Sequence, residues 1–101
     1  MASLKYLKMQ EVIRKEENVL FVKKGCPYCT KALKHADELK RKGKIDDYEV
    51  WTLGSDFDDE TLGQIVKDNG GDTHWGKATK PQIFMDSKYV GDSMAFDKYN
   101  G

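Results

Sequence analysis

The chain has 101 residues, which is the size of one ordinary domain, so we expect a single domain over residues 1–101. Lys and Arg number 17, as do Asp and Glu, and a net charge of zero argues against a dedicated nucleic-acid-binding protein. The longest apolar run, Val19–Val22, is far shorter than the ~20 residues of a membrane span. The N-terminal residues also lack the apolar core of a secretion signal. We therefore expect a cytoplasmic protein that binds neither nucleic acid nor membrane.

The hydrophobic pattern predicts eight elements in the order αβαβαββα. Helices are predicted where apolar residues recur every three or four positions, and strands where β-branched and aromatic residues cluster. In chain order these are a helix over 3–17, a strand over 19–23, a helix from the 26–29 segment to about 42, a strand over 47–53, a helix from the caps at 55–60 to about 69, strands over 82–85 and 88–90, and a helix over 93–99. A right-handed crossover followed by a hairpin makes this an α/β fold with a mixed four-stranded sheet flanked by helices.

The first predicted strand is apolar at every position rather than at alternate positions. A continuous run of this kind is typical of a central strand that is covered on both faces of its sheet. We expect Trp51 to pack in the second strand. We expect His35, which lies among lysines, to be a surface residue of its helix.

The two cysteines, Cys26 and Cys29, stand in a Cys-Pro-Tyr-Cys motif between a buried strand and the first turn of a helix. Backbone N–H groups at a helix N-terminus lack partners and carry partial positive charge, so they stabilise an anion such as a thiolate. Pro27 suits the first helical position. This placement predicts Cys26 at the N-cap with its sulfur exposed, and Cys29 one turn further along and more buried. With Lys23 and Lys24 nearby, the setting favours a reactive thiolate at Cys26.

The spacing of the two thiols predicts a division of roles. A thiolate at Cys26 attacks a disulfide to form a mixed disulfide, and Cys29 then attacks that bond and releases the reduced product. The residues alone leave three other roles open: two buried structural thiols, half of a zinc site, or an iron–sulfur cluster bridging two chains. A zinc site would lack a second cysteine pair, and His35 and His74 do not stand at ribbon or finger spacing.

The motif is part of a longer stretch, residues 19–29, that resembles the glutaredoxin family together with residues 79–84 and 89–92. The likeness spans nearly the whole chain. It implies a thioredoxin-like fold and a cis peptide bond before Pro81. It also implies glutathione as the reducing co-substrate, with no metal and no tightly bound cofactor.

The resemblance further implies where glutathione binds, with residues from four parts of the chain contributing. These are Lys23 at the glycine carboxylate, Tyr28 beside the tripeptide, Lys80 and Pro81 pairing through the Lys80 backbone with the glutathione cysteine, and Asp92 and Ser93 at the γ-glutamyl end. The segment Asp72–Lys77 looks like an addition to the family's pattern. Its Trp75 either covers apolar surface or belongs to a lip that selects protein partners.

We therefore expect a monomeric dithiol oxidoreductase that uses glutathione to reduce protein disulfides and glutathione-mixed disulfides. Ribonucleotide reductase is a common target of the family that the chain resembles. Two alternatives remain at this stage. One is a glutaredoxin-like protein that is reduced by thioredoxin reductase, and the other is a non-enzymatic module that binds an iron–sulfur cluster.

Overall fold

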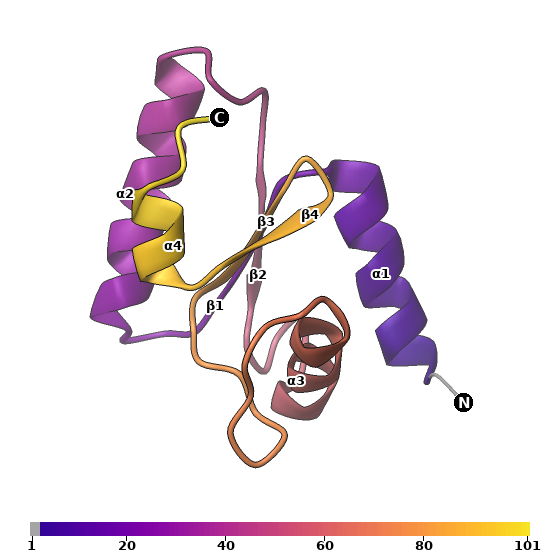
Figure 1. The fold of residues 1–101 in the computed structure, drawn as a ribbon. Coiled ribbons are helices and arrows are strands. Elements are labelled where there is room, and N and C mark those ends of the chain that lie inside the picture. Colours follow the sequence, from indigo (N-terminus) through magenta and orange to yellow (C-terminus); the bar gives the residue numbers. More distant parts are fainter. Residues whose placement is uncertain (1–2) are drawn as a thin grey trace.

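The computed structural model describes residues 3–101 and contains a four-stranded sheet with helices packed on both faces (Figure 1). The elements are α1 (Leu4–Glu16), β1 (Val19–Val22), α2 (Pro27–Arg41), β2 (Glu49–Thr52), α3 (Asp59–Asp68), β3 (Gln82–Met85), β4 (Lys88–Gly91) and α4 (Ser93–Asp97). This confirms the predicted order αβαβαββα and the α/β class. No helix within residues 3–101 combines the length and the apolar composition that a membrane crossing requires.

The second strand is shorter than the predicted range 47–53. The carboxylate of Asp47 accepts a hydrogen bond from the N–H of Tyr48 at 2.8 Å and pairs with the ammonium of Lys40 at 3.1 Å. Both contacts lie outside the sheet ladder. The Asp47 carbonyl accepts a hydrogen bond from the side-chain amide of Asn18 at 2.8 Å, while the Asn18 backbone N–H donates to the Glu16 carbonyl at 2.7 Å, so pairing with β1 starts only at Glu49. The last helix likewise ends at Asp97 rather than at Tyr99.

The strand order is β2-β1-β3-β4, with β1 parallel to β2 and antiparallel to β3, and with β3 and β4 forming a hairpin. All four residues of β1 are buried, which confirms the central strand predicted from its continuous apolar run. Phe21 faces the core under α1 and α3, whereas Leu20 and Val22 face the core under α2 and α4. The strand therefore contributes to both apolar layers of the molecule.

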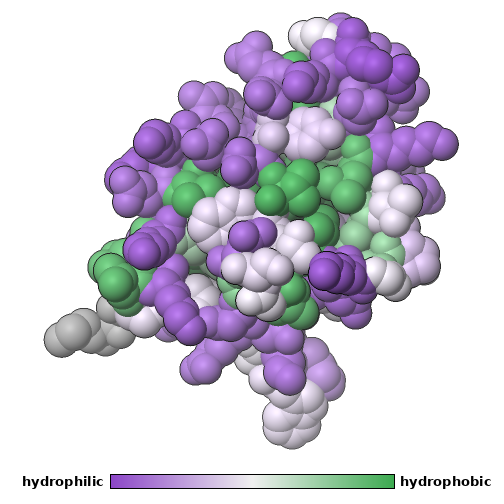
Figure 2. All heavy atoms as spheres, turned by 180° about the vertical axis from the view of Figure 1, so that it is seen from behind, coloured by the Kyte–Doolittle hydropathy of each residue, from purple (hydrophilic) through white to green (hydrophobic). Residues whose placement is uncertain are grey.

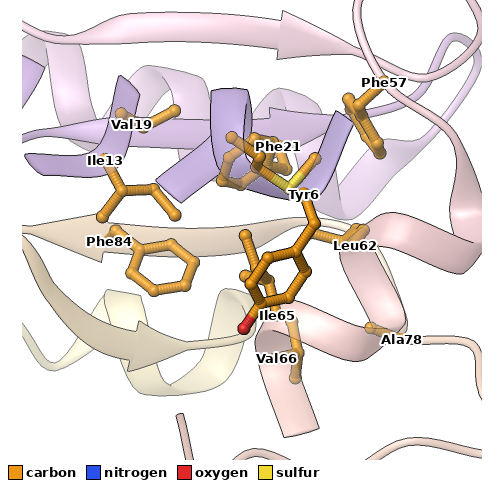
Figure 3. Packing of buried hydrophobic residues seen from close by; sticks show 11 residues of the cluster. Tyr6, Ile13, Val19, Phe21, Phe57, Leu62, Ile65, Val66, Ala78 and Phe84 are labelled. Atoms are coloured by element: carbon orange, nitrogen blue, oxygen red, sulfur yellow. The ribbon is translucent and has the colours of Figure 1, made fainter. Parts of the chain in front are cut away.

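The core under α1 and α3 is organised around Phe21 (Figure 3). The Phe21 ring meets three others edge-on, with centroids 6.1 Å from Trp51, 5.3 Å from Phe57 and 5.9 Å from Phe84. Such edge-to-face contacts add to the stabilisation that burial of the rings provides. The packing of Trp51 confirms the role predicted for it.

The core under α2 and α4 contains one residue that the sequence placed wrongly. His35 is half-buried rather than on the surface, because α4 and the last residues fold back along α2 (Figure 1). Its Nε2 atom lies 2.8 Å from the carbonyl oxygen of Tyr99, and its ring packs edge-on against Phe96 at 4.8 Å. The histidine therefore helps to fasten the C-terminal segment to α2.

Candidate active site

The Cys-Pro-Tyr-Cys motif follows the turn after β1 and forms the start of α2. Gly25 adopts φ +69°, a left-handed conformation that glycine tolerates, and turns the chain into the helix. Cys26 is the N-cap of α2, and Pro27 occupies the first helical position, as predicted. The Cys26 sulfur accepts a hydrogen bond from the backbone N–H of Cys29 at 3.2 Å. This donor and the positive end of the helix stabilise negative charge on that sulfur.

The sulfur of Cys26 is not exposed, which contradicts the sequence-based expectation. Only 7% of Cys26 is accessible, because the chain around Lys80 lies over it and its Sγ is 3.6 Å from the Lys80 carbonyl oxygen. Cys29 is more buried still, at 2%, as predicted. Both cysteines are free thiols. A disulfide that reaches Cys26 must therefore approach along the rim formed by Lys80.

The environment of Cys29 keeps it protonated. Burial, followed by a hydrogen bond with the Cys26 sulfur, raises the pKa of Cys29 from about 9 to about 11. At neutral pH this residue is a thiol, and a thiol is a poor nucleophile. Of the two thiols, Cys29 is therefore the one held in the less reactive form.

The peptide bond between Lys80 and Pro81 is cis, as the family resemblance implied. The side chain of Lys80 points inward and pairs with the carboxylate of Asp59 in the first turn of α3. Its ammonium also donates to the Ala78 carbonyl at 3.1 Å, and only 9% of the side chain is exposed. These contacts hold the Lys80 carbonyl against Cys26.

Asp59 is a site residue that the sequence did not reveal. It is one of four acids between positions 56 and 60, and nothing in the local pattern distinguishes it from the other three.

A second set of hydrogen bonds fixes the cis-proline loop on the side that faces β4. There the side-chain amide of Gln82 donates to the Thr79 carbonyl at 2.9 Å, and Gln82 in turn accepts a hydrogen bond from the hydroxyl of Tyr89 at 2.6 Å.

The other residues predicted to contact glutathione lie around these thiols. The hydroxyl of Ser93 donates to the Tyr28 carbonyl at 3.5 Å, which brings the start of α4 beside the start of α2. Tyr28 is 64% exposed, and Pro81 is fully buried. Asp92 is exposed and caps α4 by accepting the N–H of Ala95 at 3.1 Å. The exposed Lys23 follows β1 directly and is joined to the motif by the short turn at Gly25.

Two hollows open on the surface of the described residues, and residues of the cis-proline loop line one of them. A groove of about 520 Å³ runs between the segment 70–74 and the start of α4, with Thr79, Gln82 and Asp92 in its walls. A hollow of about 500 Å³ lies between α1, the end of β2 and the start of α3. Neither cysteine lines either hollow. The groove is the better candidate for substrate because Thr79 is adjacent to Lys80.

The segment Asp72–Lys77 forms a tight hairpin. His74 and Lys77 exchange two backbone hydrogen bonds, of 2.8 and 3.0 Å. Trp75 at its tip is 89% exposed, so it does not cover apolar surface. Of the two interpretations left open by the sequence, the structure therefore excludes the covering role.

The sequence model of the glutaredoxin family matches residues 18–90, which include the motif, the cis proline and most of the sheet. The chain belongs to the glutaredoxin family. This glutaredoxin is 33% identical over 81 residues to a glutaredoxin of Vibrio cholerae, covering 80% of this chain and 86% of that one. It is 30% identical over 81 residues to glutaredoxin 1 of Salmonella typhimurium, with the same two coverages of 80% and 86%.

Solved structures agree with this assignment. The reduced glutaredoxin of Escherichia coli matches with a TM-score of 0.61 and 26% identity, over 79% of this chain and 87% of that one. The buckwheat glutaredoxin–glutathione complex matches with a TM-score of 0.68 and 22% identity, covering 91% of this chain and 74% of that one. At this level of identity the match concerns the fold alone. As a glutaredoxin, the protein is a thiol–disulfide oxidoreductase with a thioredoxin-like fold.

Proposed function

We propose that this glutaredoxin reduces protein disulfides and glutathione-mixed disulfides with electrons from glutathione. One observation carries the proposal: the Cys26 sulfur accepts the Cys29 N–H at the start of α2, and it lies 3.6 Å from the carbonyl that precedes the cis proline. A thiolate is stabilised there, beside a backbone edge that can hold the disulfide being attacked. Cys26 is the nucleophile and Cys29 is the resolving thiol.

The proposed cycle exchanges thiolates without any cofactor. The Cys26 thiolate attacks one sulfur of the substrate disulfide, forms a mixed disulfide, and expels the other sulfur as a thiolate that takes up a proton. Cys29 loses its proton and attacks the Cys26 sulfur, which releases the reduced substrate and leaves a Cys26–Cys29 disulfide. Two glutathione molecules then reduce this disulfide and leave as glutathione disulfide.

The proposed glutathione site combines charge with backbone pairing. Glutathione has two carboxylates and one ammonium group, so it is a net anion at neutral pH. The exposed ammonium of Lys23 can pair with the glycine carboxylate of glutathione. The backbone of Lys80 can form hydrogen bonds with the cysteine of glutathione, as a sheet edge does with an added strand. Asp92 and Ser93 suit the γ-glutamyl end, and the ring of Tyr28 lies beside the tripeptide.

Two further points support glutathione as the partner. The buckwheat structural neighbour is a complex with glutathione. The groove beside Thr79 and Asp92 also lies next to the cis-proline loop and can hold part of a peptide-sized ligand. We place the activity in a reducing cytoplasm, with the chain acting as a monomer on oxidised proteins, ribonucleotide reductase being one candidate.

Steady-state turnover of bis(2-hydroxyethyl) disulfide tests the electron donor. We expect turnover with glutathione and glutathione reductase, and none with thioredoxin reductase in its place. Turnover with thioredoxin reductase alone would overturn the proposal and favour the reductase-dependent alternative.

Serine variants test the two thiol roles. We expect Cys26→Ser to abolish turnover. We expect Cys29→Ser to retain reduction of glutathione-mixed disulfides, since that route needs one protein thiol and a second glutathione, but to lose dithiol reduction of protein disulfides. An equal loss in both variants on a glutathionylated substrate would contradict the assignment.

A further inference from the structure

The hairpin at residues 72–77 holds an aromatic side chain in an unfavourable backbone conformation. Trp75 and Gly76 have φ of +56° and +75°, so both central residues of the two-residue turn are left-handed, as in a type I′ turn. Such turns favour Asn-Gly, and a bulky side chain at the first position is unusual. Residues held in sparsely populated conformations cluster at functional sites. The tryptophan is therefore poorly explained as a turn residue.

Trp75 is also unusual in its exposure. It is 89% accessible, whereas the other tryptophan, Trp51, is half-buried against Phe21. The hairpin stands out from the molecule as a projection below the body (Figures 1 and 2). Among the aromatic rings of residues 3–101, the ring of His74 alone packs against that of Trp75, nearly perpendicular and with centroids 5.9 Å apart. An exposed tryptophan offers a large contact area with few rotamers to lose, which is why tryptophan is enriched at binding hot spots.

The hairpin is fixed to the body rather than loosely attached. Gly63 of α3 is buried directly under it, and a Cβ atom at Gly63 would lie 1.9 Å from the carbonyl oxygen of Gly76. The backbones of α3 and the hairpin are therefore in close contact. Ala78, directly after the hairpin, is buried in the core. The backbone that carries Trp75 is thus preorganised, and preorganisation lowers the entropy lost on binding.

The hairpin is close to the reactive thiol along the chain. Trp75 precedes Lys80 by five residues, and the Lys80 carbonyl lies 3.6 Å from the Cys26 sulfur. Five residues span at most roughly 18 Å, so the Trp75 backbone lies within that distance of the rim where a substrate disulfide is held. An extended peptide covers this upper limit with about five residues.

We propose that Trp75 is a docking residue for protein substrates of this enzyme. The partner is an extended protein segment with its target cysteine opposite Lys80 and a large apolar side chain about five residues away, which packs on the Trp75 ring. A small disulfide has no apolar side chain to pack on the ring, so the contact favours protein substrates over small ones. This inference rests on the proposed reduction of protein disulfides.

Trapping of defined peptides tests the contact in a Cys29→Ser background. Each probe is a 15-residue peptide with a central cysteine activated as a 2-pyridyl disulfide. The Cys26 thiolate attacks the peptide sulfur, forms a Cys26–peptide disulfide and expels pyridine-2-thione, whose absorbance reports the rate. One peptide has leucine five residues before and five residues after the cysteine, and the other has serine at both places. We expect the leucine peptide to react about fivefold faster at subsaturating concentration, as one aromatic–aliphatic contact would give.

Two substitutions at Trp75 separate the contact from the fold. Trp75→Asn introduces the preferred Asn-Gly turn, so the melting temperature should stay equal or rise, while the fivefold preference should disappear. Trp75→Tyr keeps an aromatic ring and should retain part of the preference. Both variants should react with 2-hydroxyethyl 2-pyridyl disulfide at the parent rate, since this probe has no apolar side chain to pack on the ring.

Other outcomes are equally informative. Equal rates for the two peptides, or a leucine preference that survives in Trp75→Asn, would overturn the docking role. The proposed function fails separately, if Cys26 reacts with none of the probes or if glutathione does not support turnover. The trapping rates need no glutathione, so the two failures are distinguishable.

Discussion

The reactive centre consists of two thiols with opposite surroundings. The sulfur of Cys26 accepts a backbone N–H at the start of a helix, whereas Cys29 is buried one turn along, and burial raises its pKa to about 11. The second is therefore a protonated thiol at neutral pH. This contrast supports the proposed roles, with Cys26 as the nucleophile and Cys29 as the resolving thiol.

The raised pKa of Cys29 makes the stability of the reduced protein depend on pH. The folded state binds this proton more tightly than the unfolded chain, whose thiol titrates near pH 9. The contribution to stability is thus complete below pH 9 and is lost as the pH rises through about 11. Urea unfolding of the reduced protein at pH 8 and pH 10.5 should show a larger loss for the parent than for Cys29→Ser. Equal losses in the two proteins would contradict the raised pKa.

The ion pair between Lys80 and Asp59 leads to a second prediction at this scale. Replacing Asp59 with Asn leaves a nearly buried ammonium without its counter-charge, and we expect the free energy of unfolding to fall by about 2 kcal/mol. The exposed neighbour Glu60 supplies the matched control, because Glu60→Gln should change stability by less than about 0.5 kcal/mol. Urea titrations measure both values. A loss in Asp59→Asn no larger than that in Glu60→Gln would show that the pair does not stabilise the loop.

Among the elements, α3 supports the site although it contributes no thiol. Its first turn supplies Asp59 to the cis-proline loop, and Gly63 in its interior lies under the hairpin that presents Trp75. Both contacts depend on the position of one helix relative to loops that come later in the chain. A change inside α3 should therefore be felt at the rim of the active site.

Gly63→Ala tests this coupling. In an ordinary helix interior alanine is favoured over glycine by about 1 kcal/mol. Here the added Cβ would lie 1.9 Å from the Gly76 carbonyl oxygen, a backbone atom, so we expect a net loss of about 2 kcal/mol instead. Thermal unfolding measures the change, and amide chemical shifts at 74–77 should move. Gln64→Ala on the exposed side of α3 is the control, and it should be neutral or slightly stabilising. A Gly63→Ala protein as stable as the parent would refute the close contact.

For the whole molecule, the charges balance, with 17 basic and 17 acidic side chains. A protein of zero net charge lacks a strong long-range field, so attraction of an anion must come from local groups such as Lys23. Exposed contacts of this kind are weak and are screened by salt.

Lys23→Ala should therefore raise the Michaelis constant for glutathione about fivefold at low ionic strength. The difference should shrink at high salt, where the screening length falls to a few ångströms. The adjacent exposed Lys24 offers the control, and Lys24→Ala should have a smaller effect. Steady-state turnover at low and high salt measures both variants. Identical Michaelis constants for Lys23→Ala and the parent would remove Lys23 from the proposed site.

Local patterns in the sequence were sufficient for much of this protein. The continuous run of β1, the apolar faces of the helices and the Cys26-Pro27 start of α2 each depend on residues within a few positions of one another. Helical and strand periodicity are properties of such short windows, and so is helix capping. The element order and the N-cap position of Cys26 were therefore predictable.

Only the tertiary structure decided three contacts: Lys80 over Cys26, Lys80 with Asp59, and His35 with Tyr99. It also decided that Trp75 is exposed. Each of the three contacts joins residues that are more than 20 positions apart in the chain. No local periodicity specifies which distant backbone lies over a given side chain. That choice follows from how α3, α4 and the cis-proline loop pack on the sheet, because burial and pairing are energies of the assembled core.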